Sequence, residues 1–202
     1  YSANDALLNY DTENDPTKKV TYLTIANKQL KRLGELVENI LVMSMERRKS
    51  LKFKSEKICL KPFLEEIASA QRMRDGKEIT INAEVDKDVS IDADKTHLSN
   101  VLNNLIDNAI KYSGDNVTIT IRADGRGISV EDDGIGIPAK SIPFLFNKFY
   151  RVPHGNRLDV RGYGIGLYYV KNVLDKMGWS ISVRSKESEG SVFTIKFTAD
   201  EK

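Results

Sequence analysis

Apolar residues in the first part of the chain recur at alternating steps of three and four. The stretch from Thr17 to about Arg48 contains no proline, so one helix can run through it. Its repeating apolar positions are Leu23, Ala26, Leu30, Leu33, Val37 and Ile40. This heptad spacing predicts a long amphipathic helix that packs against a partner helix. With the apolar run Ala3–Leu8 before it, the pattern indicates a helical hairpin truncated at its N-terminus. The alternative is a helix packed on its own globular domain.

From Leu51 onward the pattern changes to short stretches in which apolar and polar residues alternate. These stretches are residues 79–85, 117–121, 128–130, 181–183 and 193–197. Alternation is typical of strands with one buried face, which favours an α+β fold over a doubly wound parallel sheet. Helical patterns separate the strands: one begins near Pro62, one covers Asp94–Tyr112, and one covers Leu167–Met177 with Gly178 as its C-terminal cap. Strands with helices on one face predict a two-layer α/β sandwich.

Composition narrows the function classes. The chain is 40% hydrophobic and 30% charged, as in a soluble globular protein, and its net charge of +2 favours neither nucleic acid nor membrane as a partner. A single cysteine, Cys59, excludes an internal disulfide, and we expect it to be a small buried residue. The domain prediction is a partial helical hairpin in residues 1–50 and the sandwich in residues 51–202.

The predicted helix Asp94–Tyr112 carries polar groups at one border of its apolar stripe. At about 100° per residue, Asn104, Asn108 and Lys111 fall together on that border. An ammonium group suits phosphates, and an amide oxygen can bind Mg²⁺, which takes few protein ligands and keeps several waters. Taken alone, the same pattern also describes an ordinary solvated helix face.

Two glycine-rich motifs follow this helix. The segment "VEDDGIGIP" (Val130–Pro138) ends a predicted strand with Asp132 and continues into two glycines, where the backbone can approach a flat ligand closely. Its alternatives are an acidic turn or a calcium loop, but the EF-hand spacing is absent. The segment "RGYGIGLYYV" (Arg161–Val170) places alternate glycines directly before a helix, whose N-terminal N–H groups form an anion site.

In this order and on this α+β background, the motifs closely resemble those of one family. The chain resembles the catalytic ATP-binding domain of sensor histidine kinases, in the superfamily shared with DNA gyrase, the mismatch-repair ATPases and a heat-shock chaperone. The segment "NNLIDNAIKYS" (Asn103–Ser113) is similar to the N box of the family. The other two segments are similar to its G1 and G2 boxes, and "FNKFYR" (Phe146–Arg151) to its F box. The resemblance covers essentially the whole chain, and it implies a Bergerat-type ATP-binding fold preceded by part of a dimerisation and phosphoacceptor hairpin.

The resemblance implies a role for each matched position around the base and the metal. Asn108 would bind the Mg²⁺ that bridges the phosphates of ATP, with Asn104 beside them. Tyr112 would pack near the nucleotide, and Asp132 would accept a hydrogen bond from the adenine amino group. The residues expected to leave room for the base are Gly134, Gly136 and Ile137.

The phosphates would be held by a second set of residues. Lys111 and Arg151 are the expected phosphate-stabilising side chains. Between Phe146 and Arg161 the resemblance implies a mobile lid, held in place by Phe146 and Phe149. The residues expected to wrap the phosphates at the start of the last helix are Gly162, Gly164, Ile165, Gly166 and Leu167.

The implied activity is transfer of the ATP γ-phosphoryl group to a histidine and then to an aspartate on a response-regulator receiver domain. The family's acceptor histidine, which an acid and a proline follow, has no counterpart here, and we expect it upstream of Tyr1. The only histidines are His97, expected in solvent or at a helix cap, and His154, expected in the lid. This fragment should therefore bind ATP without labelling itself.

Two other readings stay open: an ATP-driven clamp of the gyrase or chaperone type, and a non-catalytic module that dimerises and senses nucleotide. Hydrolytic members of the superfamily carry a glutamate one turn before the metal-binding asparagine, and here Asn104 takes that place. The resemblance also implies a homodimer through the hairpin and a cytoplasmic location, with the parent protein anchored in a membrane. No apolar run in this chain reaches the roughly 20 residues that span a bilayer, so no direct membrane contact is expected.

Overall fold

The computed structural model describes residues 20–26, 29, 30, 33, 53–71, 78–86, 89–153 and 164–197. The chain divides into two compact units, Tyr1–Ser50 and Leu51–Lys202. In the first unit the described residues are helical. Leu23, Leu30 and Leu33 of the predicted apolar stripe are 51%, 66% and 58% exposed, so no other described residue covers this part of the stripe. The rest of the predicted long helix and the run Ala3–Leu8 lie outside the described residues.

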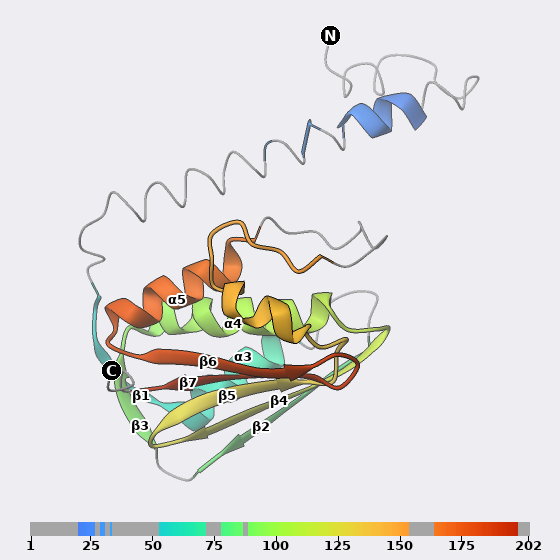
Figure 1. Cartoon of the computed structure of the whole chain (residues 1–202). Helices are drawn as coiled ribbons and strands as arrows, with labels where there is room; N and C mark the ends of the chain where they lie inside the picture. The colour runs from blue at the N-terminus through green and yellow to red at the C-terminus, as the bar shows by residue number, and fades with distance from the viewer. Residues whose placement is uncertain are drawn as a thin grey trace. The chain divides into compact units, whose positions relative to one another are not determined.

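A five-stranded mixed sheet forms the base of the second unit (Figure 1). Its strands, in spatial order, are β2 (Glu78–Val85), β4 (Asn116–Asp124), β5 (Gly127–Asp132), β7 (Gly190–Lys196) and β6 (Ser180–Lys186). Strands β2 and β4 are parallel, and every other neighbouring pair is antiparallel. The α+β prediction is confirmed, because the alternating stretches form a sheet with one buried face.

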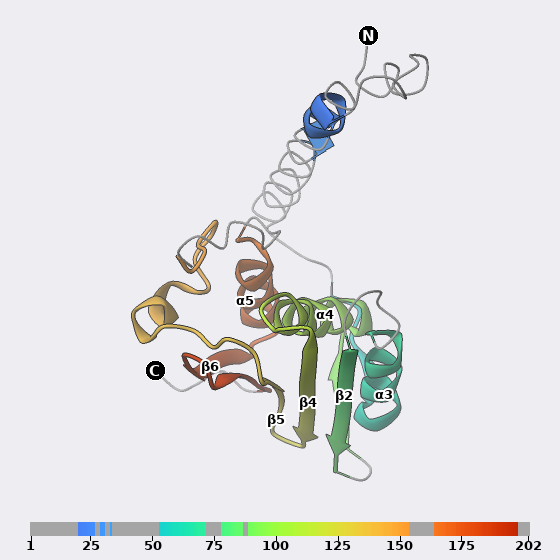
Figure 2. The ribbon, with the colours of Figure 1, turned by 90° about the vertical axis from the view of Figure 1, so that its right-hand side faces the viewer.

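Three helices cover that face: α3 (Leu60–Gln71), α4 (Lys95–Lys111) and α5 (Gly166–Lys176) (Figure 2). Helix α4 is the central one, and it contacts α3, α5, β4 and β5. Leu98, Leu102 and Ile106 of its apolar stripe are fully buried. The two-layer sandwich follows from that stripe, since one helix face and one sheet face exclude water from each other. Among the described residues, no helix is long and apolar enough to cross a lipid bilayer.

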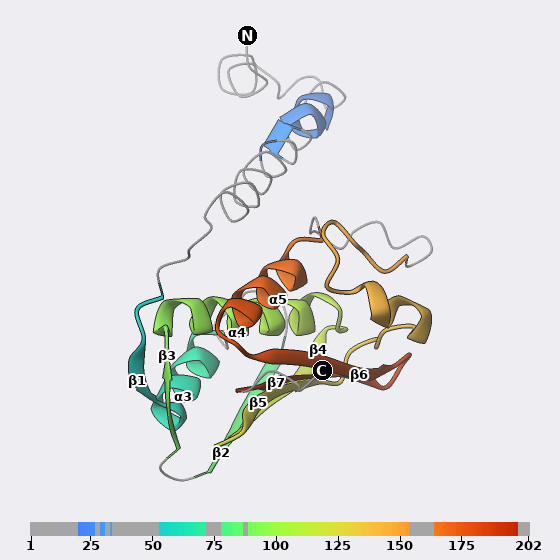
Figure 3. The ribbon, with the colours of Figure 1, turned by 60° about the vertical axis from the view of Figure 1, so that its left-hand side comes forward.

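A second, two-stranded sheet lies beside the helices and was not predicted. It pairs β1 (Glu56–Cys59) with β3 (Ser90–Ala93) in antiparallel register (Figure 3). In β1 the buried side chain is Ile58, whereas Cys59 is exposed with its sulfur 3.3 Å from the Ser90 hydroxyl oxygen. The prediction of a buried cysteine is therefore wrong, because adjacent residues of a strand face opposite sides.

Asp94 connects the start of α4 to the segment that enters the second unit. It is the N-cap residue of α4, and its carboxylate accepts hydrogen bonds from the backbone N–H of His97 at 2.9 Å and of Lys54 at 2.8 Å. Burial by itself would raise the pKa of Asp94, but these hydrogen bonds to the charged form outweigh it and leave the pKa below its ordinary value. One carboxylate therefore both caps the central helix and fixes the chain 40 residues before it.

Replacing this carboxylate should weaken the fold. Asp94→Ala is expected to lower the free energy of unfolding by about 2 kcal/mol, because it removes a helix cap and leaves the Lys54 N–H without its acceptor. Because the folded pKa is depressed, this contribution is full above the unfolded carboxyl pKa and is lost as the pH falls through the folded value. Urea unfolding at several pH values measures both effects. Asp92→Ala, at an exposed position of β3, is the matched control and should stay within about 0.5 kcal/mol of the parent.

Candidate functional site

The polar border of α4 lies where the sequence places it. Asn104 and Asn108 are half-buried on the helix, and Lys111, the last residue of the helix, is exposed. Tyr112 is the half-buried C-cap, and its N–H donates to the Asn108 carbonyl oxygen at 2.9 Å. Two amides and an ammonium group thus follow one edge of the helix toward its C-terminal end.

The start of α5 lies directly against this border. The Asn104 side-chain nitrogen donates to the Asn100 carbonyl oxygen at 2.8 Å. Its side-chain oxygen lies 2.8 Å from the point that a Cβ on Gly166 would occupy. Gly166 is the first residue of α5, and Ile165 before it makes no side-chain capping hydrogen bond. The first turn of α5 therefore presents backbone N–H groups without a side-chain cap next to an amide, which is an arrangement that suits an anion.

Asp132 lies at the end of β5, half-buried beside the first glycine loop. One of its carboxylate oxygens accepts a hydrogen bond from the Gly134 N–H at 2.9 Å. Burial raises the pKa of Asp132, and the neighbouring charge of Asp133 raises it further, although the hydrogen bond from Gly134 opposes them. Asp133 has a different partner, because its carboxylate accepts from the Thr118 N–H of β4 at 3.0 Å. The two adjacent carboxylates therefore have different hydrogen-bond partners: the Gly134 N–H for Asp132, and the Thr118 N–H for Asp133.

The loop after Asp132 fits tightly between α4 and the β6–β7 turn. A Cβ on Gly134 would lie 2.9 Å from the Tyr112 carbonyl oxygen, and that oxygen accepts from the Ile135 N–H at 3.0 Å. Gly136 has φ +66, and a Cβ there would lie 1.9 Å from the Lys186 carbonyl oxygen. Both glycines are thus required by close backbone approach on opposite sides of the loop.

A backbone hydrogen bond links the first part of the predicted lid to Gly164, which follows it. The Phe149 N–H donates to the Gly164 carbonyl oxygen at 3.0 Å, and both residues have positive φ, of 63° and 75°. Phe146 packs against the core, whereas the Phe149 side chain is 50% exposed, so only the backbone of Phe149 is fixed here. Arg151 is exposed just after this point. Gly162 and His154 lie outside the described residues.

His97 was expected in solvent or at a helix cap, and its backbone does take part in the cap of α4, but its side chain is not in solvent. Its side chain is half-buried, with its ring centroid 5.0 Å from that of Phe53 and its Nδ1 3.4 Å from the Tyr169 hydroxyl oxygen. Burial raises the pKa of that tyrosine. Only the backbone of His97 takes part in the cap of α4. The side chain belongs to the contact between α4 and α5, which no local motif indicates.

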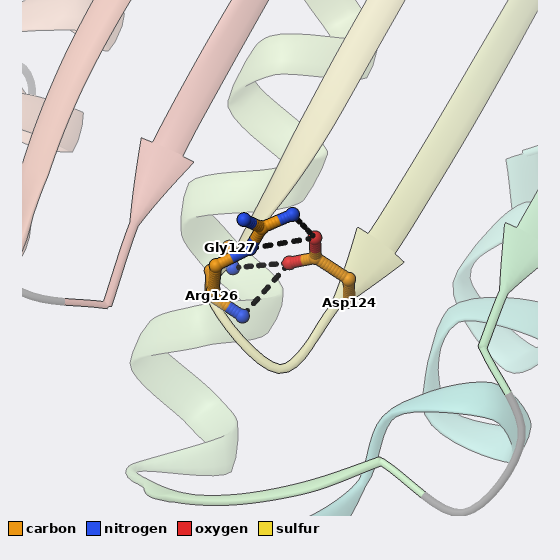
Figure 4. A network of polar contacts seen from close by, with 3 residues as sticks. All are labelled: Asp124, Arg126 and Gly127. Carbon is orange, nitrogen blue, oxygen red and sulfur yellow. Dashed lines mark hydrogen bonds and ion pairs between the residues drawn. The ribbon is translucent and has the colours of Figure 1, made fainter.

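A groove of about 920 Å³ lies elsewhere, around the turn between β4 and β5. There the Asp124 carboxylate accepts from the backbone N–H groups of Arg126 at 2.8 Å and Gly127 at 3.0 Å, and it pairs with the Arg126 guanidinium (Figure 4). Gly127 begins β5 and Asp132 ends it, so the groove is at the other end of the strand from the predicted site. It contains none of the residues that the resemblance singles out.

The comparison with protein families decides the classification. The family described as "Histidine kinase-, DNA gyrase B-, and HSP90-like ATPase" matches residues 93–201. The chain belongs to this ATPase family. All four motifs, from the N box at Asn103–Ser113 to the G2 box at Arg161–Val170, lie within the matched region. The resemblance drawn from those motifs is confirmed.

Individual proteins that are similar to the chain in sequence or in fold are sensor proteins and histidine kinases. The chain is 34% identical to the sensor protein RprX of Bacteroides fragilis over 85% of its length, and 32% identical to the sensor histidine kinase WalK of Bacillus subtilis over 88%. It spans only about a third of each relative, 34% and 30% respectively. The fold also matches histidine kinase ThkA in a complex with the response regulator protein TrrA. The TM-score of this match is 0.66 and the sequence identity is 22%, and the matched region covers 96% of this chain and 55% of the ThkA chain.

Two serines beside the first glycine loop have only a weak signal in the sequence. Ser185 and Ser191 lie on β6 and β7 beside the first glycine loop, and their hydroxyl oxygens are 3.0 Å apart. Neither belongs to the motifs that predicted the other site residues. Their signal is a weak one: serine stands at positions where the alternation of each strand calls for an apolar residue.

Proposed function

We infer that residues 51–202 bind ATP with Mg²⁺ and act as the catalytic core of a sensor histidine kinase, which transfers the γ-phosphoryl group to a histidine. The observation that carries this proposal is the contact of Asn104 with the start of α5 at Gly166. It puts the amide border of α4 beside the N-terminal backbone groups of α5. The ATPase family of residues 93–201 and the names of the relatives RprX and WalK support the same function.

Each end of the nucleotide would have its own partners. The half-buried carboxylate of Asp132 would accept from the adenine amino group, while the backbone N–H groups of α5 and the Lys111 ammonium would face the phosphates. The half-buried amide of Asn108 offers one hard oxygen ligand on the same helix edge, which fits Mg²⁺ shared with phosphate oxygens. The metal would neutralise charge on the phosphates when bound, and the protein would position the reacting group.

The identity of residue 104 favours a kinase over an ATP-driven clamp. The Asn104 side chain is a hydrogen-bonded amide, and an amide cannot take a proton from water as a general base. The site would therefore hold ATP for transfer rather than hydrolyse it in a cycle. Steady ATP hydrolysis that Asn104→Ala abolishes would favour the clamp instead.

The wider context of the domain is also part of the proposal. ThkA was solved with a response regulator protein, and we extend that kind of partner to the parent of this chain. Leu23, Leu30 and Leu33 of the apolar stripe are left uncovered by the described residues, which supports a homodimer through the helical region. We place this part of the protein in the cytoplasm, since ATP and the receiver domain are found there.

The metal assignment has a direct test. Asn108→Ala should remove the Mg²⁺ dependence of ATP binding, because it deletes the one amide oxygen proposed to bind the metal. The measurement is ATP affinity by isothermal titration calorimetry, with Mg²⁺ and with EDTA. Asn108→Asp, which keeps an oxygen ligand, should retain the dependence. Asn172→Ala removes a comparable amide from α5 and should leave it unchanged. An Asn108→Ala protein that keeps the parent's Mg²⁺ dependence would contradict the assignment.

The raised pKa of Asp132 predicts a pH dependence of ATP binding. The amino group of adenine needs the charged carboxylate as its acceptor, so ATP affinity should fall as Asp132 is protonated. Because burial raises its pKa, the fall should begin at a higher pH than for an ordinary aspartate. Titrations between about pH 4 and pH 8 measure this. The same series on Asp132→Asn corrects for titration of the ligand. Identical pH profiles for the parent and Asp132→Asn would contradict the prediction.

A further inference from the structure

A row of polar residues crosses the buried face of the sheet beside the first glycine loop. The register pairs Val130 of β5 with Phe193 of β7, and Phe193 with Val183 of β6, giving an apolar row against the helices. In the next row on the same face, two positions away on each strand, the same register aligns Asp132, Ser191 and Ser185. Residues two apart on a strand face the same side. The sheet therefore continues its apolar face with an acid and two hydroxyl groups, which need hydrogen-bond partners there.

Ser185 is the centre of the hydrogen bonds in this row. Its hydroxyl oxygen accepts from the Ile137 N–H at 2.8 Å and donates to the Gly190 carbonyl oxygen at 2.7 Å. The Ser191 hydroxyl oxygen lies 3.0 Å away and is 6% exposed as a residue. A carbonyl can only accept, so the single proton of Ser185 goes to Gly190, and the Ser191 hydroxyl must be the donor to Ser185. The direction of the network is thereby fixed.

The network holds both sides of the glycine loop. Toward α4, the Ile135 N–H donates to Tyr112, and toward β6–β7 the Ser188 N–H donates to the Ile135 carbonyl oxygen at 2.8 Å. Those two hydrogen bonds join backbone groups, whereas the bond at Ile137 depends on the Ser185 side chain. It is the one loop attachment among these three that a point mutation can delete without changing the backbone.

The acceptor of the same hydroxyl, Gly190, packs against the backbone of Asp132. Gly190 lies so close to β5 that a Cβ there would be 2.0 Å from the Asp132 carbonyl oxygen. Ser185 therefore connects the residue after Gly136 to the residue packed on Asp132. Loss of this hydroxyl leaves the Ile137 N–H unpaired and lets the loop move away from β6.

We propose that Ser185 is a positioning residue for adenine recognition: its hydroxyl holds the loop Asp133–Ile137 and Gly190 in the geometry in which Asp132 accepts from a 6-aminopurine. This inference rests on the proposed function, because it deepens the assignment of Asp132. Ser185 itself would not touch the nucleotide, and its effect would pass through Ile137 and Gly190. It should therefore change selection of the base more than attachment of the phosphates.

The test is calorimetric affinity for Mg·ATP and Mg·GTP, well below the melting temperature so that the protein stays folded. Ser185→Ala should bind ATP about 5- to 20-fold more weakly, the value of one hydrogen bond plus an unpaired N–H, with GTP affinity almost unchanged. The selectivity for ATP over GTP falls by the same factor. Ser182→Ala is the matched control: the same substitution at an exposed position of β6 should leave both affinities at the parent level.

Two further variants keep the outcome interpretable. Ser185→Thr keeps the hydroxyl on a residue type that suits strands and should restore ATP selectivity, whereas Ser185→Cys keeps the size with a weak hydrogen-bonding atom and should behave like alanine. ATP selectivity at the parent level in Ser185→Ala, or in Ser185→Cys if the alanine variant does not fold, overturns the inference. In that case weakened binding by Asp132→Asn would leave the proposed function standing. Unchanged binding by Asp132→Asn would overturn both.

Discussion

Asp132→Asn should weaken the binding of adenine nucleotides by about one to two orders of magnitude, the value of one charge-assisted hydrogen bond. The substitution keeps the size of the side chain and replaces the charged acceptor by an amide. The Gly134 N–H, now 2.9 Å from a carboxylate oxygen, can still donate to the amide oxygen, so the loop should keep its position. The substitution removes the negative charge of the carboxylate. Burial disfavours that charge in the free protein, and the adenine amino group would stabilise it in the complex.

The control for this prediction is the next residue. Asp133→Asn makes the same chemical change, but this carboxylate is exposed and accepts from Thr118 of β4 at 3.0 Å. An amide oxygen can replace it there, so ATP affinity should stay within about twofold, as for other exposed substitutions. Calorimetric titration of Mg·ATP into both variants measures the difference. Equal affinities for the two variants would place the adenine site elsewhere.

The elements that local pattern specifies were predictable from the sequence. The apolar stripe of α4 follows from helical spacing alone, and Leu98 and Leu105 are buried where that spacing puts them. The end of α5 follows from Gly178, which has φ +73 and is followed by a hydrogen bond from the Trp179 N–H to the Leu174 carbonyl oxygen at 2.9 Å. In both cases the signal is local: apolar residues at helical spacing form the buried face, and a glycine supplies the positive φ that ends the helix.

Contacts between distant segments were not predictable in the same way. Strands β1 and β3 have four residues each, too short for alternation to distinguish them from loops, so the small sheet was missed and Cys59 was assigned to the wrong side. His97 was expected in solvent or at a helix cap. The partners of its side chain could not be predicted, because they are Phe53 and Tyr169, the latter 72 residues away. The role of Ser185 could not be predicted either: its sequence signal is weak, and its bond to Ile137 spans 48 residues. A hydrogen bond of this kind is specified by the fold rather than by neighbouring residues.

The glycine loop supplies the other large effect that we expect. Gly136→Ala should lower the free energy of unfolding by about 2–4 kcal/mol and reduce ATP affinity by more than about tenfold. Alanine at φ +66 costs about 1–2 kcal/mol by itself, because its Cβ crowds the following carbonyl group. The larger problem is a neighbour that cannot move aside easily, the Lys186 backbone carbonyl oxygen 1.9 Å from the new Cβ. Either the loop or the β6–β7 turn must shift.

A shift of either segment disturbs the same site. Ile135 and Ile137 on the two sides of Gly136 are hydrogen-bonded to Ser188 of that turn and to Ser185 of β6, so separation of the loop from β6 and its turn breaks both bonds. Urea unfolding and calorimetric titration of Mg·ATP on one preparation measure the two effects. Gly125→Ala is the control, since it has no atom within 4 Å of its Cβ and no positive φ, and it should remain within about 0.5 kcal/mol of the parent. Stability lost with ATP affinity intact would mean that the loop supports the fold without shaping the adenine site.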